Sequence, residues 1–482
     1  MKVLLINLPG ESLRKPEEHC GLAFLKSYLD MNNIYVEIFD AYAKRKTLAE
    51  TINFIESFIT ENMGKDLYIC VSPFVTSHES FVVIGERIKR MFPKVYIIVG
   101  GHYASLNKEY LLKTYDWIDA IIVGEGEVSL YELLTKPGTE NIPGVYKRQF
   151  QDHFVKRDRI VNLDDLPFQS RYLTMDELEG QPLAITTSRG CYGECSFCSI
   201  SSFYKLNGCI KQTYRSARSV SNEIHKLVNE FGIESLKIVD DNFFRGNSDK
   251  FLEELIEMTK DLNVKYRLSA RPNDITKYRA QKLKELGATV IGIGAESAHR
   301  KSLELFNKGI EISHSDKAIA ILSAANITTL VNFIMFNPII DIDGLFENCL
   351  FVEKHMEHCL FHRINSHLWI RSTDPLVDRL ACMGLCDRQG FPYIKCRYQY
   401  EDVLDIKKIF DVWCNSNMKE YYRFADILMA KGIHGNEEVY INYKKILIKD
   451  VEILKTLILL SKKGLLKKEG MEYIIENMEA IK

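Results

Sequence analysis

The N-terminal part of the chain, residues 1–138, alternates short apolar runs with longer amphipathic stretches. Short apolar runs predict buried strands, and the amphipathic stretches between them predict helices. Strands are expected at Val3–Asn7, Val36–Phe39, Leu67–Val71, Val95–Val99 and Ile118–Val123, and helices over Gly21–Asn32, Thr51–Thr60 and Ser80–Met91. Because strands that alternate with helices pair in parallel, the pattern predicts a doubly wound, Rossmann-like domain of α/β class.

The alternation stops between residues 139 and 180 and then resumes. This segment holds turn formers such as Pro143-Gly144 and Asp164-Asp165 without sustained periodicity, which predicts a linker. Further strands are expected at Leu183–Thr187, Ser235–Val239, Val264–Ser269, Thr289–Gly294 and Thr328–Phe336, with helices such as Ser219–Phe231 and Ser248–Leu262. Residues 181–375 are therefore expected to form a second parallel α/β domain, a partial (β/α) barrel.

From about residue 370 the pattern becomes helical and charged, so residues 376–482 are expected to form a helix-rich cap. Four aromatic residues gather there and could shape a substrate site: Phe391, Tyr393, Tyr398 and Tyr400. The apolar stretch Ile453–Leu466 is interrupted by lysines too early for a membrane span. It predicts an amphipathic helix, with contact to a membrane surface or a partner as the alternative.

Composition narrows the function classes. The chain has 482 residues, enough for two or three domains, and a formal charge of −2, which gives no electrostatic case for a nucleic-acid partner. The N-terminus lacks a signal-peptide pattern, which favours a cytoplasmic location. Since the cytosol keeps thiols reduced, the 12 cysteines point to metal chemistry rather than to disulfides.

Three of these cysteines form a local cluster. Cys191, Cys195 and Cys198 have the spacing C-x3-C-x2-C directly after a predicted strand. Three thiolates on one short loop can hold three irons of a [4Fe–4S] cluster and leave the fourth iron open to a ligand. Zinc is the competing metal, but structural zinc sites need four ligands, and no second C-x2-C pair or histidine lies nearby.

With these cysteines the sequence resembles the radical S-adenosylmethionine (SAM) superfamily, in the branch with an N-terminal cobalamin-binding-like domain. The resemblance implies that the open iron chelates SAM, whose reductive cleavage gives a 5′-deoxyadenosyl radical. Further matches are the aromatic residue before the third cysteine, the acidic strand end after Ile238, the Ser-Ala-Arg-Pro strand end and the G-x-E-S-like strand. The SAM-binding residues implied by these matches are Phe197, Asp240, Asp241, Ser269, Arg271, Glu296 and Ser297. Asn337 departs from the family because relatives usually have glycine before this proline.

Turns after three N-terminal strands are candidates for a cobalamin site. Ligands of doubly wound sheets bind beyond the carboxyl ends of the strands, where glycine lets the backbone approach closely. The residues are Ser72, Thr76, Ser77, Gly100, Gly101, His102, Gly124, Glu125 and Gly126. The alternative is that these glycines only close tight turns. Because the D-x-H-x-x-G motif is absent, the resemblance implies cobalamin without a histidine ligand to cobalt.

The resemblance implies cobalamin-dependent methylation of a carbon in a small molecule or natural-product intermediate, with a flavodoxin- or ferredoxin-type reductant. The alternative within the family is a cobalamin-free dehydration, epimerisation or rearrangement, with a structural N-terminal domain. Two other classes fit less well. An iron–sulfur electron carrier would not need SAM-like strands downstream, and a cobalamin sensor would not need the cysteines. Cys382, Cys386 and Cys396 are expected to be thiols, with a second cluster as the alternative.

Overall fold

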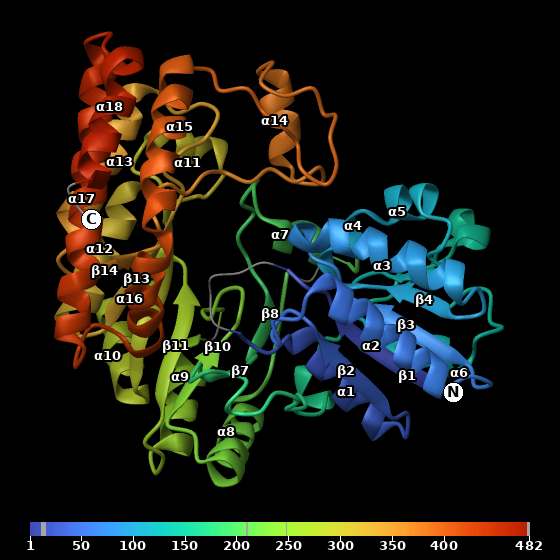
Figure 1. Cartoon of the computed structure of the whole chain (residues 1–482). Helices are drawn as coiled ribbons and strands as arrows, with labels where there is room; N and C mark the ends of the chain where they lie inside the picture. Colours follow the sequence, from blue (N-terminus) through green and yellow to red (C-terminus); the bar gives the residue numbers. More distant parts are fainter. Residues whose placement is uncertain (11–15, 209–210, 247, 480–482) are drawn as a thin grey trace. The chain divides into compact units, whose positions relative to one another are not determined.

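The structure is a computed structural model that describes residues 1–10, 16–208, 211–246 and 248–479. It divides into two compact units (Figure 1). The first unit comprises residues 1–192 and 199–223, and the second comprises residues 193–198 and 224–482.

A six-stranded sheet forms the centre of the first unit, in the order β2-β1-β3-β4-β5-β6. The strands are β1 (Lys2–Asn7), β2 (Val36–Asp40), β3 (Leu67–Val71), β4 (Tyr96–Val99), β5 (Ala120–Ile122) and β6 (Val145–Tyr146). The first five are parallel, as predicted, and the doubly wound order is confirmed. The two-residue β6 pairs antiparallel with β5 and comes from the segment predicted as a linker, where so short a strand shows no periodicity.

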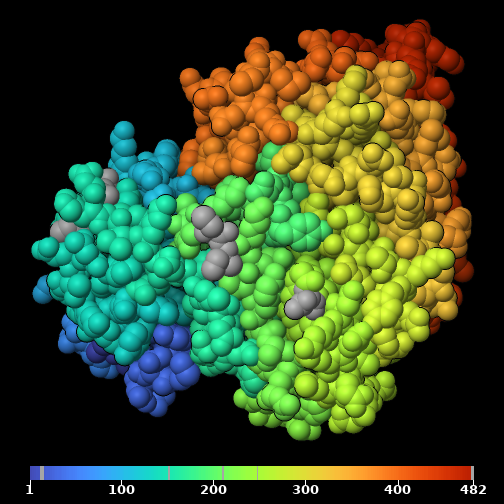
Figure 2. Space-filling view, turned by 180° about the vertical axis from the view of Figure 1, so that it is seen from behind, coloured from blue at the N-terminus to red at the C-terminus, as the bar shows by residue number. Residues whose placement is uncertain are grey.

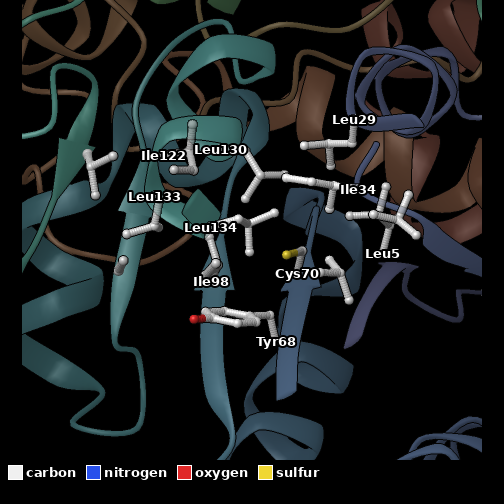
Figure 3. Packing of buried hydrophobic residues seen from close by; sticks show 14 of the residues in the cluster. Leu5, Leu29, Ile34, Tyr68, Cys70, Ile98, Ile122, Leu130, Leu133 and Leu134 are labelled. Carbon is white, nitrogen blue, oxygen red and sulfur yellow. The ribbon is translucent and has the colours of Figure 1, made fainter. Parts of the chain in front are cut away.

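Helices cover both faces of this sheet. They are α1 (Cys20–Met31), α2 (Leu48–Glu61), α3 (His78–Met91), α4 (Gly101–Leu106), α5 (Lys108–Thr114) and α6 (Glu127–Thr135). On one face, apolar side chains of α1 and α6 pack onto alternate residues of the strands, among them Leu5, Cys70 and Ile98 (Figure 3). Side chains of alternate strand residues form this apolar face, and side chains three or four residues apart on the helices cover it.

The remaining strands and α-helices of the first unit come before and after the cysteine cluster in the sequence. They are β7 (Leu183–Ile185), β8 (Ser188–Gly190), α7 (Ser199–Lys205), β9 (Gln212–Tyr214) and the first part of α8 (Ala217–Phe231). β8 and β9 pair antiparallel, and Gly190 has a φ of +92°. A Cβ at Gly190 would lie 2.1 Å from the carbonyl oxygen of Lys211, so the residue before Cys191 has to be glycine.

Five parallel strands in the order β10-β11-β12-β13-β14 form the sheet of the second unit. They are β10 (Ser235–Ile238), β11 (Lys265–Ala270), β12 (Ala288–Glu296), β13 (Thr328–Phe333) and β14 (Cys359–Phe361). The helices between them are α9 (Ser248–Thr259), α10 (Lys277–Leu286), α11 (Arg300–Leu305), α12 (Ile312–Ala324) and α13 (Ile342–His355). This regular alternation confirms the predicted second α/β domain.

The C-terminal region is helical, as predicted, with one exception. Its helices are α14 (Leu376–Cys382), α15 (Glu401–Ser416), α16 (Met418–Lys431), α17 (Glu437–Lys462) and α18 (Leu466–Glu479). Residues 383–400 contain no helix, because Gly384, Arg388 and Gly390 have positive φ angles that interrupt helical geometry. α14 packs on the end of α11, where Arg379 donates to the carbonyl of Leu305, and the two segments adjoin in Figure 2.

The predicted amphipathic helix over Ile453–Leu466 belongs mostly to α17. Most of its apolar side chains are buried, although Leu459 is exposed, and α17 packs against α13, α15, α16 and α18. Among the described helices, none is long and apolar enough to cross a membrane.

Candidate cluster and SAM site

Backbone hydrogen bonds fix the loop that carries Cys195 and Cys198. The amide of Cys198 donates to the carbonyl of Cys195 at 3.1 Å, so both residues lie in one turn. The amide of Ser196 donates to the carbonyl of Phe306 at 2.8 Å, and its carbonyl accepts from the amide of Leu376 at 2.9 Å. The loop is therefore held between the end of α11 and the start of α14, on groups that no local sequence pattern reveals.

Phe197 is half-buried and contacts Phe306, with ring centroids 5.3 Å apart. Its carbonyl accepts a hydrogen bond from Nη2 of Arg371 at 3.0 Å. Arg371 in turn is bound by Asp374, whose Oδ2 accepts from the amide and from Nε of Arg371. Burial raises the pKa of Asp374 to about 6 although Arg371 lies beside it.

Cys191 belongs to the first unit, and Cys195 and Cys198 belong to the second. Within the described residues, no three His, Cys, Asp or Glu side chains are close enough to hold a metal ion. The feature that fits a [4Fe–4S] cluster is therefore the chemistry of the ligands, which are three thiols within eight residues.

Arg271, directly after β11, lies against the second of these thiols. Its Nη1 is 3.5 Å from Sγ of Cys195, and its Nη2 donates to the carbonyl of Lys308. The backbone amide of Arg271 donates to Oδ1 of the buried Asn242 at 3.0 Å. The guanidinium can therefore donate a hydrogen bond to this sulfur.

A buried ion pair lies at the end of β12. Nζ of Lys308 is 2.8 Å from Oε1 of Glu296, and both side chains are about nine-tenths buried. Glu296 has a φ of +64° at a break in the register with β13. A Cβ at Gly294 would collide with the Glu296 carboxylate, so glycine leaves room for the pair. Burial alone would lower the pKa of Lys308, but Glu296 and Cys195 outweigh it and the pKa is raised.

The other predicted SAM residues lie at the ends of strands but differ in exposure. Asp240 is buried, whereas Asp241 and Ser269 are exposed. Ser297 is fully buried, and its hydroxyl donates to Oδ1 of Asn348 at 3.0 Å. Arg271 and Glu296 thus lie on the same polar cluster as Cys195, joined by Lys308. The partnership of Lys308 with Glu296 arises from tertiary structure and cannot be seen in the sequence.

On the first unit, the predicted cobalamin residues after β3 and β4 adjoin each other. A Cβ at Gly101, which has a φ of +85°, would lie 2.8 Å from Oγ of Ser72. The hydroxyl of Ser77 donates to the carbonyl of Phe74, and Thr76 is exposed. Gly100 is half-buried just before α4. The ring of His102 stacks on Phe203 of α7 with centroids 3.8 Å apart.

The turn after β5 is filled by the chain itself. A Cβ at Gly124 would lie 1.9 Å from the amide oxygen of Asn207, and one at Gly126 would lie 3.1 Å from Leu25. Glu125 accepts hydrogen bonds from Nη1 of Arg189 and from the amide of Ile160. Close packing of the unit is therefore sufficient reason for these glycines.

His19, which no sequence signal had marked, presents a buried donor at the same edge of the sheet. Its Nδ1 accepts from the amide of Leu22 at 3.2 Å, so the ring proton is on Nε2. Nε2 is buried and has no hydrogen-bond partner in the part of the chain that the structure describes. The ring is 5.4 Å from that of Phe74, and burial lowers its pKa, although Asp40 opposes this.

Comparison with known proteins places the chain in a class. Residues 185–345 match the Radical SAM superfamily. Uncharacterized methyltransferase PH0819 of Pyrococcus horikoshii is 27% identical over 70% of this chain and 74% of its own length. The anaerobic magnesium-protoporphyrin IX monomethyl ester cyclase of Cereibacter sphaeroides is 25% identical over 66% of this chain and 52% of its own length.

The whole fold also has a solved counterpart. OxsB, a cobalamin-dependent SAM radical enzyme solved with aqua-cobalamin and SAM, superposes with a TM-score of 0.76 at 19% identity, covering 99% of this chain and 78% of OxsB. Residues 185–345 therefore carry a radical SAM domain, which confirms the family prediction for this part of the chain. This domain implies a [4Fe–4S] cluster and SAM as cofactors.

Proposed function

We propose that this enzyme methylates a carbon atom of a small molecule and that it depends on cobalamin. The observation that carries the proposal is that the chain combines two features. One is the three-cysteine loop, which Arg271 and the Lys308–Glu296 pair adjoin. The other is a doubly wound unit whose sheet edge presents a buried N–H donor without a hydrogen-bond partner among the described residues. The methyltransferase name of the Pyrococcus relative and the cobalamin of OxsB support it.

In the second unit, Cys195 and Cys198 would ligate the cluster together with Cys191. When bound, the cluster supplies the electron that cleaves SAM to methionine and a 5′-deoxyadenosyl radical, which takes a hydrogen atom from the substrate. Arg271 contacts the sulfur of Cys195 and donates to the carbonyl of Lys308, so it links the cluster loop to the residue that pairs with Glu296. Phe197, Asp240, Asp241, Ser269 and Ser297 remain proposed SAM contacts.

In the first unit, the edge next to β1 and β3 is the better candidate for cobalamin. The turn after β5 is filled by Asn207, whereas His19 offers an N–H that burial has removed from water. A buried donor without an acceptor costs about 1–3 kcal/mol, a cost that a hydrogen bond from a ligand would remove. When bound, cobalamin supplies the methyl group. Ser72, Gly100 and Gly101 would lie near it.

A second candidate function is a radical reaction without methyl transfer. It is favoured by the similarity to the magnesium-protoporphyrin IX monomethyl ester cyclase, whose name describes ring formation and no methyl transfer. In that case the first unit would be structural. A flavodoxin- or ferredoxin-type reductant is part of both proposals.

The test is a cofactor and product analysis of the whole chain. The protein is purified without oxygen, reconstituted with iron and sulfide, incubated with hydroxocobalamin and desalted, and its metals are counted. It is then mixed with SAM and dithionite, and 5′-deoxyadenosine and S-adenosylhomocysteine are measured by mass spectrometry. A Cys195→Ala variant is the control for cluster-dependent cleavage.

Cobalamin-dependent methylation predicts about four irons and one cobalt per chain. Both nucleoside products are expected, because one SAM is the radical source and another the methyl source. Iron and 5′-deoxyadenosine without cobalt or S-adenosylhomocysteine would contradict methylation and favour the second candidate. Absence of 5′-deoxyadenosine in the reconstituted protein would contradict both.

A further inference from the structure

Three aromatic side chains of the second unit form a continuous row. The rings of His367 and Trp369 stack with centroids 4.9 Å apart at an angle of 29°, and those of Trp369 and Tyr393 are also 4.9 Å apart. We name these three residues the aromatic row. Trp369, at its centre, is 55% exposed. The other two tryptophans, Trp117 and Trp413, are almost fully buried, so an exposed tryptophan is unusual in this chain.

The row stands on a backbone that is fixed on both sides. The amide of Leu368 donates to the carbonyl of Phe336 at 2.9 Å, which places this segment beside the chain that leaves the carboxyl end of β13. On its other side, the amide of Ile394 donates to the carbonyl of Ile370 at 2.9 Å. The position of Trp369 is therefore determined by extended pairing, not by a loop tip.

Alternation along this segment separates two faces. Leu368 and Ile370 are buried in an apolar cluster with Ile394, so the residues between and after them project to the other side. Those residues are Trp369 and Arg371. The aromatic row is thus the outward side of a well-packed layer, which keeps the rings in place without any ligand and reduces the entropy lost when one binds.

Arg371 connects this segment to the cluster loop. Its Nη2 donates to the carbonyl of Phe197, the residue before Cys198, at 3.0 Å. Substrate sites of (β/α) barrels are built on segments that follow the carboxyl ends of strands, and this segment follows β14. The row therefore lies two residues along the chain from a contact with the loop that would generate the radical.

The chemistry of the row selects a class of ligand. Burial lowers the pKa of His367, Lys407 adds to this effect and Asp411 opposes it, so the lowered pKa favours the neutral imidazole in the row. Neutral rings with exposed faces bind other planar π-systems by offset stacking, which a saturated ring or an alkyl chain cannot match.

We propose that the aromatic row binds the substrate, and that the substrate carries a planar conjugated or heteroaromatic ring which stacks on Trp369. This inference rests on the proposed function in that it assigns the substrate of the same enzyme. Trp369 is then a specificity-determining residue, and His367 and Tyr393 hold its indole in position.

The test is calorimetric titration of the reconstituted holoenzyme, with S-adenosylhomocysteine present in excess to occupy the SAM site. The planar probes are cytidine, nicotinamide and protoporphyrin IX. Ribose is the saturated counterpart of cytidine and cyclohexanecarboxamide that of nicotinamide, and protoporphyrin IX is compared with both. The variants are Trp369→Leu, Trp369→Phe and, as a control at an exposed ring in the first unit, Tyr35→Leu.

At least one planar probe is expected to bind more tightly than the saturated counterparts. Since stacking on an aromatic side chain contributes roughly 1–3 kcal/mol, Trp369→Leu should weaken binding of that probe about fivefold or more. Trp369→Phe, which keeps a ring, should stay within about threefold of wild type, and Tyr35→Leu should have no effect.

The proposal is overturned if no planar probe binds better than its saturated counterpart, or if Trp369→Leu binds the probe as wild type does. Formation of 5′-deoxyadenosine from SAM is measured on the same preparations. Normal SAM cleavage with no stacking would reject the substrate class and leave the proposed function intact, whereas loss of cleavage in wild type would reject the proposed function.

Discussion

At the scale of residues, the polar cluster behind Cys195 depends on charges that balance each other. Lys308→Met is expected to leave the Glu296 carboxylate buried without its cation, which costs roughly 3–5 kcal/mol of unfolding free energy. Glu296→Gln should be destabilising too, because Lys308 then loses its counter-charge. Denaturant unfolding of the cluster-free chain measures both.

The double variant Glu296→Gln/Lys308→Met distinguishes pairing from independent roles. If the two residues stabilise the fold mainly through each other, the double variant should recover part of the stability lost in each single variant. Strictly additive losses would show that the ion pair is not the main contribution.

Cys382, Cys386 and Cys396 give a second prediction at this scale. Cys382 is exposed, while burial and the neighbouring Cys386 raise the pKa of Cys396 to about 12, which disfavours the thiolate that iron needs. Replacing all three by serine is expected to leave about four irons per reconstituted chain. The matched triple replacement of Cys191, Cys195 and Cys198 should remove nearly all iron, and a drop of about half in the first variant would indicate a second cluster.

The sequence predicts chemically active residues where their spacing alone identifies them, as in the C-x3-C-x2-C loop. The partners of these residues were not predictable, because Arg271 lies 76 positions from Cys195 and the orphaned donor of His19 appears only when the surrounding side chains are packed. Gly124 shows the converse, since its conformation and Asn207 explain the glycine without any ligand.

At the scale of elements, a buried ion pair links the barrel to α17. Nη2 of Arg363, just after β14, donates to Oδ1 of Asp450 at 2.8 Å, and Nε1 of Trp413 in α15 donates to the same oxygen. Asp450→Ala would leave Arg363 buried without a counter-charge. We expect a loss of about 3–5 kcal/mol in chemical denaturation.

A matched control is the pair that joins Lys462 of α17 to Asp343 of α13 at the surface. Exposed pairs contribute little, so Asp343→Ala should change the denaturation midpoint only slightly. Equal effects of the two alanine variants would show that the Arg363–Asp450 pair does not anchor α17.

The segment that contacts the cluster loop should respond to pH. Burial raises the folded-state pKa of Asp374 to about 6 from an ordinary value of 3.8. A raised carboxyl pKa means that the folded state binds the proton more tightly, so the contribution of Asp374 to stability is lost as pH rises from about 4 to about 6. Asp374→Asn cannot ionise, yet it keeps an oxygen for the amide of Arg371.

Urea denaturation of the cluster-free chain at several pH values measures this effect. The unfolding free energy of the wild-type chain should fall relative to that of Asp374→Asn between pH 4 and pH 6. Above pH 7 the two curves of unfolding free energy against pH should be parallel. Parallel curves over the whole range would mean that the carboxyl titrates normally in the folded chain.

Long elements were predicted well because a clear period needs several turns or several alternations. Strands such as β3 and β12, and helices such as α2, which begins with a capping box at Thr47 and Glu50, are of this kind. Short elements, such as β6, β14 and α4, were missed because they span too few residues to show a period. Residues 383–400 are a part of the helix-rich cap without a helix, because positive φ angles at three positions interrupt helical geometry.

At the scale of the whole molecule, the order of the two α/β folds along the chain could be predicted, because each strand–helix alternation is local in sequence. Function could be predicted only as far as the cysteine motif extends. The choice of substrate depends on residues such as Trp369, whose alternation with Leu368 and Ile370 becomes meaningful once the segment is known to be extended.

The proposed function requires that the two units bind different cofactors. This division can be tested with two variants, one expected to lose cobalt and the other to lose iron. His19 belongs to the first unit and Cys195 to the second. His19→Phe removes the buried N–H while keeping a planar ring of similar size, so it should lower the cobalt retained after desalting and leave the iron content unchanged. Cys195→Ala should lower iron and leave cobalt unchanged.

Leu29, a residue of α1 whose side chain is buried in the core, offers the matched control for His19. Leu29→Met conserves volume and should leave both metals unchanged, so a loss of cobalt in this variant would point to a general loosening of the unit. The absorption spectrum of bound cobalamin supplies a readout that does not depend on turnover. If His19→Phe retains cobalt as wild type does, the buried donor serves only the fold, and the cobalamin edge must then be sought at Ser72, Gly100 and Gly101.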